Sequence, residues 1–117
     1  MSNDETLLQQ EIRLALGKIP TLRLFRNQVG QLPHPKSGRY VQFGLAKGSS
    51  DLIGFKKVKI TSDMVGKEIA QFVSIEIKTN KNKPTQIQQH WLNYIHESGG
   101  ISGVARSIKD ALNILSL

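Results

Sequence analysis

The chain has no cysteine among its 117 residues. This absence excludes both a disulfide framework and a zinc site built on thiolates. The three histidines, His34, His90 and His96, also lack the short spacing that zinc-binding motifs require. The sequence therefore argues against zinc chemistry.

Long apolar segments are also missing. No run approaches the roughly 18 apolar residues that a transmembrane helix needs. The N-terminus, Met1 to Glu5, is acidic and lacks the apolar segment of a signal peptide. We therefore expect a soluble, intracellular protein with no membrane partner.

Acidic residues are scarce, since 9 Asp and Glu stand against 16 Lys and Arg, giving a formal net charge of +7. Backbone phosphates attract Lys and Arg whatever the base sequence, so this excess predicts a polyanionic partner. The alternative is a basic surface that binds nothing. With 117 residues the chain is long enough for one hydrophobic core and too short for two, so we expect a single domain, residues 1–117.

Apolar periodicity and turn residues outline the elements that follow one another along the chain. The predicted elements are a helix from Asp4 to Lys18, a strand from Leu22 to Arg26, a polar loop from Asn27 to Gly38, a minor strand from Tyr40 to Leu45, strands from Asp51 to Ile60 and Gln71 to Thr79, a helix from Pro84 to Ser98, a strand from Ile101 to Ala105 and a last helix after Ser107. This order predicts an α/β fold with a mixed sheet.

The segment from Ser74 to Lys83 carries the clearest chemical signal. Glu76 and Lys78 are two residues apart, so in a strand they share one face. A half-buried carboxylate and amine must pair with each other or with another charge, and a divalent cation is a natural third party because carboxylate oxygens are hard ligands. The alternative is a plain surface ion pair. We expect the opposite face of the strand to be core, formed by Val73, Ile75 and Ile77.

Asp51 is the upstream acid that can complete such a site. A turn rich in Gly and Ser, beginning at Gly48, delivers it to the start of an apolar strand. Hydrolysis of a phosphodiester needs a nucleophilic water and a neutralised transition state, and one or two Mg²⁺ or Mn²⁺ ions can supply both. Two acids and a lysine at the ends of neighbouring strands thus predict a metal-dependent phosphodiesterase site.

Short segments in this order resemble the motifs of the VRR-NUC family, a branch of the PD-(D/E)XK nuclease superfamily. The segments are Glu5 to Gln9, Leu22 to Asn27, Gly48 to Gly54, Glu76 to Thr79, Thr85 to Gln88 and Val104 to Ser107. The resemblance implies a restriction-endonuclease-like α-β-β-β-α-β core with a mixed central sheet flanked by helices. Ser50 stands where the superfamily has proline, but the Gly-Ser-Ser-Asp pattern of the VRR-NUC family accommodates it.

The same resemblance implies roles for individual residues. Asp51, Glu76 and the backbone carbonyl of Ile77 would bind Mg²⁺ or Mn²⁺, and Lys78 would orient or deprotonate the attacking water or stabilise phosphate charge. Glu5 resembles the family's acid on the first helix, which contributes directly or through water. Glu11 competes with it because it also lies toward the apolar arc of that helix, and a simple contribution to the helix dipole is a further alternative for Glu5.

Gln88 matches a family glutamine whose amide can bind a metal-bound water or a phosphate, although a solvated helix face explains it equally simply. Further residues are expected to contact DNA, chiefly through its phosphates. They are Arg26, Asn27, Lys47, Ser49, Ser50, Lys81, Lys83 and Arg106.

The resemblance implies a metal-dependent, structure-selective DNA endonuclease that is similar to a Holliday-junction resolvase and cuts branched DNA. Two symmetric cuts would suit a homodimer, and standalone members of the family imply the cytoplasm of a bacterium or a phage-infected host cell. One alternative is a flap or nonspecific nuclease. Another is a basic DNA-binding module without activity.

Overall fold

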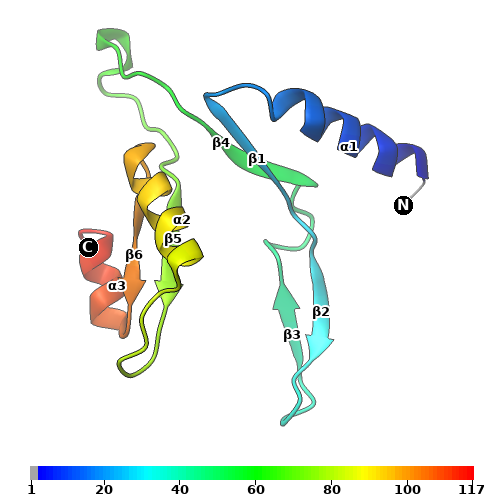
Figure 1. Ribbon diagram of the computed structural model, residues 1–117, viewed down its shortest axis with the longest axis vertical. Coiled ribbons are helices and arrows are strands. Elements are labelled where there is room, and N and C mark those ends of the chain that lie inside the picture. The colour runs from blue at the N-terminus through cyan, green and yellow to red at the C-terminus, as the bar shows by residue number, and fades with distance from the viewer. Residues whose placement is uncertain (1–2) are drawn as a thin grey trace. The chain divides into compact units, whose positions relative to one another are not determined.

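The computed structural model describes residues 3–117 of the chain. The chain divides into two compact units, Met1–Val58 and Lys59–Leu117, which are called here the N-terminal and C-terminal units (Figure 1). Helices occur in both units, together with antiparallel strands in the first and parallel strands in the second. The predicted α/β class is therefore confirmed.

The N-terminal unit consists of one helix and four strands. These are α1 (Asn3–Leu16), β1 (Leu22–Arg26), β2 (Gly30–Pro33), β3 (Tyr40–Phe43) and β4 (Leu52–Lys56). Acidic residues in the first turn of α1 and Arg13 in its last turn favour the helix through its dipole. The helix lies beside β1.

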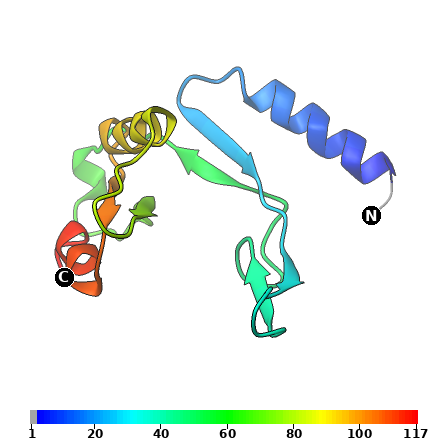
Figure 2. The same cartoon turned by 60° about the horizontal axis from the view of Figure 1, so that its bottom comes forward.

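The four strands form two antiparallel pairs. In the β1–β4 pair, Arg26 lies opposite Leu52, so the end of one strand meets the start of the other. The β2–β3 pair is a hairpin that extends beyond the β1–β4 pair (Figure 2). The prediction of a loop from Asn27 to Gly38 is therefore wrong over Gly30–Pro33. A strand of four residues is too short to show a period, and its pairing with β3 rather than its own pattern makes it a strand.

The C-terminal unit is built around a strand, helix and strand in succession. Its elements are a short 3₁₀ helix (Ser62–Met64), β5 (Val73–Ile77), α2 (Gln86–Glu97), β6 (Ile101–Ala105) and α3 (Ile108–Ile114). The strands β5 and β6 are parallel, and α2 is the crossover between them. The helix α2 packs against both strands, and α3 packs against β6.

Two side-chain hydrogen bonds fix α2 on one face of the parallel pair. The indole N–H of Trp91 donates to Ser74 Oγ over 2.7 Å, and Ser102 Oγ donates to the carbonyl of Leu92 over 2.6 Å. The register places Ser74 opposite Ser102, so these bonds join the helix to both strands on the same face. Glu76 and Lys78 share that face with Ser74 because strand side chains alternate.

The buried side chains among the described ones all belong to the C-terminal unit. They are Leu92 at 4% exposure, Ile95 at 1% and Ala105 at 1%. The prediction that Val73 and Ile77 fill a core face is wrong, since these side chains are 45% and 67% exposed. The helix on that face, α3, packs against β6, where Ile114 lies against Gly103, and has no comparable packing against β5 within the described residues.

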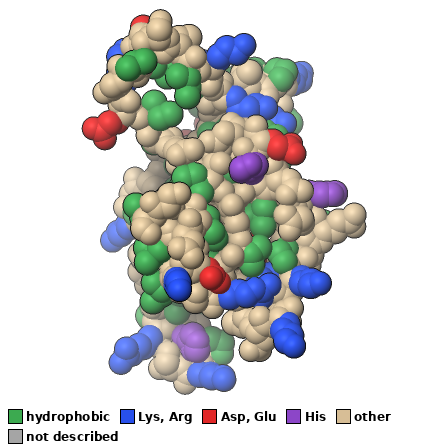
Figure 3. All heavy atoms as spheres, turned by 90° about the vertical axis from the view of Figure 1, so that its left-hand side faces the viewer, with side chains coloured by type: hydrophobic (Ala, Val, Ile, Leu, Met, Phe, Trp, Pro, Cys, Tyr) green, Lys and Arg blue, Asp and Glu red, His purple; other side chains and the backbone are tan. Residues whose placement is uncertain are grey.

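Within the described residues the strands form three two-stranded sheets, β1–β4, β2–β3 and β5–β6. The mixed central sheet of an α-β-β-β-α-β core therefore stays a prediction. None of the helices described over residues 3–117 has the length and apolar character to cross a membrane. Basic side chains outnumber acidic ones in the view of Figure 3, in agreement with the net charge of +7.

Candidate active site

Asp51 is placed by the last rungs of the β1–β4 pair. Beyond the Arg26–Leu52 rung, the backbone N–H of Asn27 donates to the carbonyl of Asp51 over 2.8 Å. The ladder thus continues by one step and ties the end of β1 to Asp51. The Asp51 side chain is exposed, and its backbone is held by β4, which follows it, and by the hydrogen bond from Asn27 on the neighbouring strand.

The side chain of Asn27 holds the turn that leads to Asp51. Its amide nitrogen donates to Ser49 Oγ over 2.7 Å and to the carbonyl of Ser50 over 2.9 Å. Its amide oxygen accepts from the backbone N–H of Leu45 over 3.1 Å. Gly48 begins the turn with a φ of 86°, in the left-handed region that a glycine occupies at little cost.

These bonds give Asn27 a positioning role that its sequence does not reveal. The sequence suggests that Asn27, Ser49 and Ser50 contact DNA. In the structure the Asn27 amide nitrogen donates to both the Ser49 hydroxyl and the Ser50 carbonyl. A contact of these residues with DNA stays a prediction, whereas their part in shaping the Asp51 turn is observed.

Two adjoining hollows in the N-terminal unit share Asp51. The first, of about 320 Å³, lies between α1 and the start of β4 and is lined by Glu5, Leu8, Gln9, Ile12, Asp51 and Leu52. The second, of about 260 Å³, is lined by Gln9, Arg26, Asn27, Gln28, Val29, Ser49 and Asp51. Asp51 and Gln9 line both hollows.

The chemistry of the two hollows differs. The first holds two carboxylates, which are oxygen ligands of the kind that hard divalent cations prefer. The second holds the guanidinium-bearing Arg26 beside amide and hydroxyl groups, which suits an anionic phosphate. A hollow with two carboxylates and a hollow with a guanidinium group thus lie on either side of Asp51.

The hollows also bear on which acid of α1 belongs to the site. Glu5 lines the first hollow with Asp51, while Glu11 lines neither of the two. This placement favours Glu5. Gln9 was missed as a site residue, although its position one helical turn after Glu5 puts both side chains on the same face of α1 and is visible in the sequence.

Glu76 and Lys78 form the corresponding feature of the C-terminal unit. Glu76 lies opposite Val104 in the parallel pair, and the N–H of Lys78 extends that pairing by donating to the carbonyl of Ala105 over 3.1 Å. Lys78 Nζ lies 4.0 Å from Glu76 Oε2, and the two side chains are 18% and 30% exposed. Both side chains keep part of their contact with water, and their separation is that of a long ion pair.

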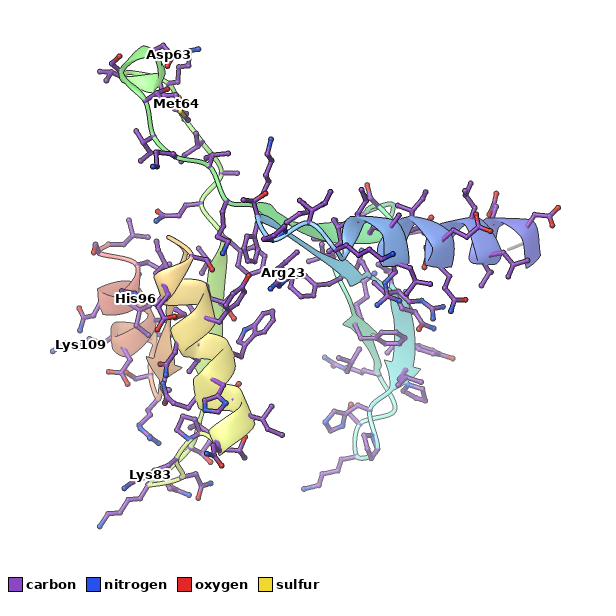
Figure 4. The ribbon with its side chains drawn as sticks, turned by 45° about the horizontal axis from the view of Figure 1, so that its top comes forward. Arg23, Asp63, Met64, Lys83, His96 and Lys109 are labelled. Carbon is purple, nitrogen blue, oxygen red and sulfur yellow. The ribbon has the colours of Figure 1, made fainter. Side chains whose placement is uncertain are left out.

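The turn after β5 is held by Arg106. Its guanidinium donates to the carbonyl of Asn80 over 3.0 Å, and its backbone N–H donates to the carboxylate of Asp110 over 2.8 Å. Asn80 has a φ of 54° in the left-handed region, where asparagine is one of the better tolerated residues. The exposed Lys81 and Lys83 lie on this turn, and Lys83 extends outward from it in Figure 4.

Gln88 takes part in starting α2. Its side-chain oxygen accepts from the N–H of Thr85 over 2.9 Å, and Thr85 Oγ1 accepts from the N–H of Gln88 over 3.2 Å. This is a capping box, and its sequence signature, Thr-x-x-Gln ahead of an apolar run, is readable without a structure. The capping role is observed, and the predicted role toward phosphate or a metal-bound water stays a prediction.

Comparison with known proteins places the whole site within one family. The model of the VRR-NUC domain matches residues 4–109. The chain belongs to the VRR-NUC family. No curated protein and no solved structure matches the chain. VRR-NUC domains are nuclease domains, so the chain has a nuclease-type, DNA-processing function with DNA as its substrate.

The predicted site residues of this VRR-NUC domain are distributed over both units. The first unit gathers Glu5, Arg26, Asn27, Ser49 and Asp51 around the two hollows. Ser50 and the exposed Lys47 lie on the same turn as Ser49, and the second unit contains Glu76, Ile77, Lys78, Lys81, Lys83, Gln88 and Arg106. Within each unit, over residues 3–117, no three His, Asp or Glu side chains form a cluster that could hold a metal ion. A joint site of Asp51 with Glu76 stays a prediction.

Proposed function

We propose that this VRR-NUC chain is a metal-dependent, structure-selective DNA endonuclease that hydrolyses phosphodiester bonds in branched DNA, in the manner of a Holliday-junction resolvase. The observation that carries the proposal is the shared position of Asp51, between a hollow with two carboxylates and a hollow with Arg26. The proposal treats residues 1–117 as one nuclease domain with a restriction-endonuclease-like core.

The residues present fit a divalent cation. Asp51 and Glu5 offer carboxylate oxygens to one hollow, and no cysteine or soft ligand competes with them, which suits Mg²⁺ or Mn²⁺. Glu76 and the carbonyl of Ile77 would be further ligands, because they belong to the Glu-x-Lys motif. A bound ion of this kind would supply Lewis acidity toward the phosphate and lower the pKa of a bound water.

The side chains of the chain itself would do the remaining work. Asn27 and the Gly48 turn hold the backbone of Asp51 and so set the direction of its carboxylate. Arg26 would bind a phosphate oxygen beside the scissile bond. Lys78 would orient the attacking water through its ammonium group and offset the charge that grows on the phosphate.

A four-way junction has two equivalent bonds to cut, so the proposal includes a two-fold homodimer with one site for each cut. The DNA of a bacterial or phage-infected cell is the expected substrate, and the cytoplasm is its expected location. The net charge of +7 supports binding to DNA of any sequence.

Cleavage assays on labelled DNA test the proposal. Four-way-junction, flap and linear duplex DNA would be incubated with the protein in Mg²⁺ or Mn²⁺, with EDTA and with Asp51→Asn protein as controls. We expect symmetric cuts in the junction that both controls abolish. Cutting of flaps or duplex at equal rates would favour a flap or nonspecific nuclease, and binding without cutting in either metal would favour a noncatalytic DNA-binding module.

A further inference from the structure

The β2–β3 hairpin is a surface that the nuclease chemistry described above does not use. Residues 31–48, which include nearly all of the hairpin, are exposed. The hairpin nevertheless carries large side chains in open positions, among them Tyr40 at 72% exposure and Leu32 at 63%. An isolated two-stranded hairpin is only marginally stable in water. An exposed apolar and aromatic surface of this size therefore indicates a binding role.

The register separates the hairpin into two faces of different chemistry. Leu32 lies opposite Val41, and Gly30 lies opposite Phe43, so these residues share an apolar face. The ring of Phe43 lies over Gly30, where an added Cβ would collide with the ring carbon Cζ. The other face, called here the amide face, consists of the opposed pairs Gln31–Gln42 and Pro33–Tyr40.

The tip of the hairpin is ordered by its own hydrogen bonds. The imidazole Nδ1 of His34 accepts from the backbone N–H groups of Lys36, over 3.1 Å, and Ser37, over 3.3 Å. The N–H of His34 donates to the carbonyl of Arg39 over 2.7 Å, and Gly38 closes the turn with a φ of 71°. Lys36 and Arg39 are therefore carried on a defined turn directly next to the Pro33–Tyr40 pair.

The charged residues of the hairpin and its flanking segments indicate which kind of partner suits the hairpin surface. Between Glu11 and Asp51 the sequence has no acidic residue, while its Lys and Arg residues there are Arg13, Lys18, Arg23, Arg26, Lys36, Arg39 and Lys47. A two-fold contact between copies would pair this acid-free surface with itself and bring like charges together. A polyanion such as DNA would instead be attracted to these basic side chains.

We propose that the hairpin is a DNA-binding ribbon that recognises branch points, with Lys36 and Arg39 on phosphates and Tyr40 stacked on a base that the branch leaves unstacked. A two-stranded ribbon has the width to enter the major groove, and amides such as Gln31 and Gln42 can bond to base edges there. Aromatic stacking on an exposed base favours branched over fully paired DNA because every base of a continuous duplex is already stacked. The inference rests on the proposed nuclease function and assigns its preference for branched DNA to a named element.

The test measures DNA affinity without cleavage, so that its outcome is independent of catalysis. The full chain would be titrated in EDTA against labelled four-way-junction DNA and against continuous duplex of equal length, at several salt concentrations. Tyr40→Ala should weaken junction binding by roughly five- to one-hundredfold and leave duplex binding nearly unchanged, while Tyr40→Phe, which keeps the ring, should bind as the unchanged protein does.

The charge on the tip is tested by a matched pair of double variants. Lys36→Ala with Arg39→Ala should weaken binding to both DNAs and lower the slope of log affinity against log salt by about one for each cation removed. Lys67→Ala with Lys109→Ala removes the same charge from exposed positions outside the hairpin, where Lys109 extends from α3 in Figure 4, and should change binding less than twofold.

Two results would overturn the inference. Unchanged junction affinity in both hairpin variants, with thermal melting also unchanged, would show that the hairpin does not bind DNA. A change of oligomeric state by light scattering, with DNA affinity unaltered, would show that the hairpin binds a second copy instead. Either result would leave junction cleavage by the unaltered protein intact, whereas failure of the proposed function would appear as no cleavage at all.

Discussion

Asp51 and Glu76 are held in place in different ways. Asp51 follows a turn that is fixed by the hydrogen bonds of one partly buried side chain, Asn27, in a unit where none of the described residues is fully buried. Glu76 lies on a strand in parallel pairing, under a helix whose Leu92 and Ile95 are buried. One acid depends on a polar network, and the other depends on packed apolar side chains.

This difference has a physical consequence. A turn held by a few hydrogen bonds loses its geometry when a single partner is removed, because no packed side chains hold it in place. A packed strand is sensitive above all to lost volume. Substitutions of polar residues should therefore disturb the first region, and substitutions of apolar residues should disturb the second.

We expect the largest loss of cleavage from substitution of Lys78, which takes part in the proposed reaction itself. Lys78→Met removes the ammonium next to Glu76 with little change in side-chain length, and we expect the cleavage rate to fall by about a hundredfold or more. DNA binding in EDTA should stay within about twofold, since one phosphate contact at most is lost. Single-turnover cleavage of junction DNA measures the loss. The same substitution at Lys109, an exposed lysine of the same unit, serves as the control, and equal losses in the two variants would contradict the assignment.

The next largest effect is the loss of stability expected when a buried side chain of α2 is shortened. Ile95 is 1% exposed, so Ile95→Ala should lower the free energy of unfolding by about 2–5 kcal/mol through lost burial and a cavity. Ile87 lies on the same helix at 82% exposure, and Ile87→Ala should cost less than about 1 kcal/mol. Urea denaturation followed by circular dichroism measures both. Similar costs for the two variants would show that α2 is not packed as described.

The polar region is tested by Asn27→Ala, which removes three hydrogen bonds around the Asp51 turn. We expect cleavage to fall by about ten- to a hundredfold, as is usual when a residue that orients a metal ligand is lost. Affinity for Mn²⁺, measured by calorimetry without DNA, should fall in parallel, which a DNA-contacting role would not predict. Asn93 is an exposed asparagine that accepts one hydrogen bond from Gln89, and Asn93→Ala should leave both quantities unchanged.

The smallest expected effect concerns the start of α2. Gln88→Ala removes one half of the capping box and should lower the free energy of unfolding by about 0.5–1 kcal/mol. The exposed Gln86 in the same turn offers a matched substitution that keeps the box. If Gln88→Ala also reduces cleavage far more than Gln86→Ala does, Gln88 has the additional role toward phosphate or water that its motif predicts.

The sequence predicts the parts of the molecule that depend on local pattern. The helix α1, the strands β5 and β6 and the helix between them follow from apolar spacing, and Gly48 and Asp51 follow from a turn signature. The capping role of Gln88 was equally readable from Thr85. These features each involve residues within a few positions of one another.

What the sequence does not predict depends on contacts between distant residues. The strand β2 exists because it pairs with β3, and its own four residues carry no clear period. Asn27 forms hydrogen bonds with residues 18 to 23 positions away, and no local sequence pattern can predict such contacts. The exposure of Val73 and Ile77 follows from the packing of α3 against β6 rather than β5, which the alternation of the strand cannot show.

We propose that Asp51 and Glu76 serve one metal-dependent reaction. The most direct test of this claim is the single-turnover rate of junction cleavage in Mg²⁺ or Mn²⁺ by Asp51→Asn, Glu76→Gln and the double variant, all shown to be folded and to bind the junction in EDTA. Groups that act as one unit are not additive, so each single variant should fall close to the background rate and the double variant should be no slower. A single variant that cuts at close to the unaltered rate, or a double variant whose loss is the product of two modest single losses, would contradict the claim.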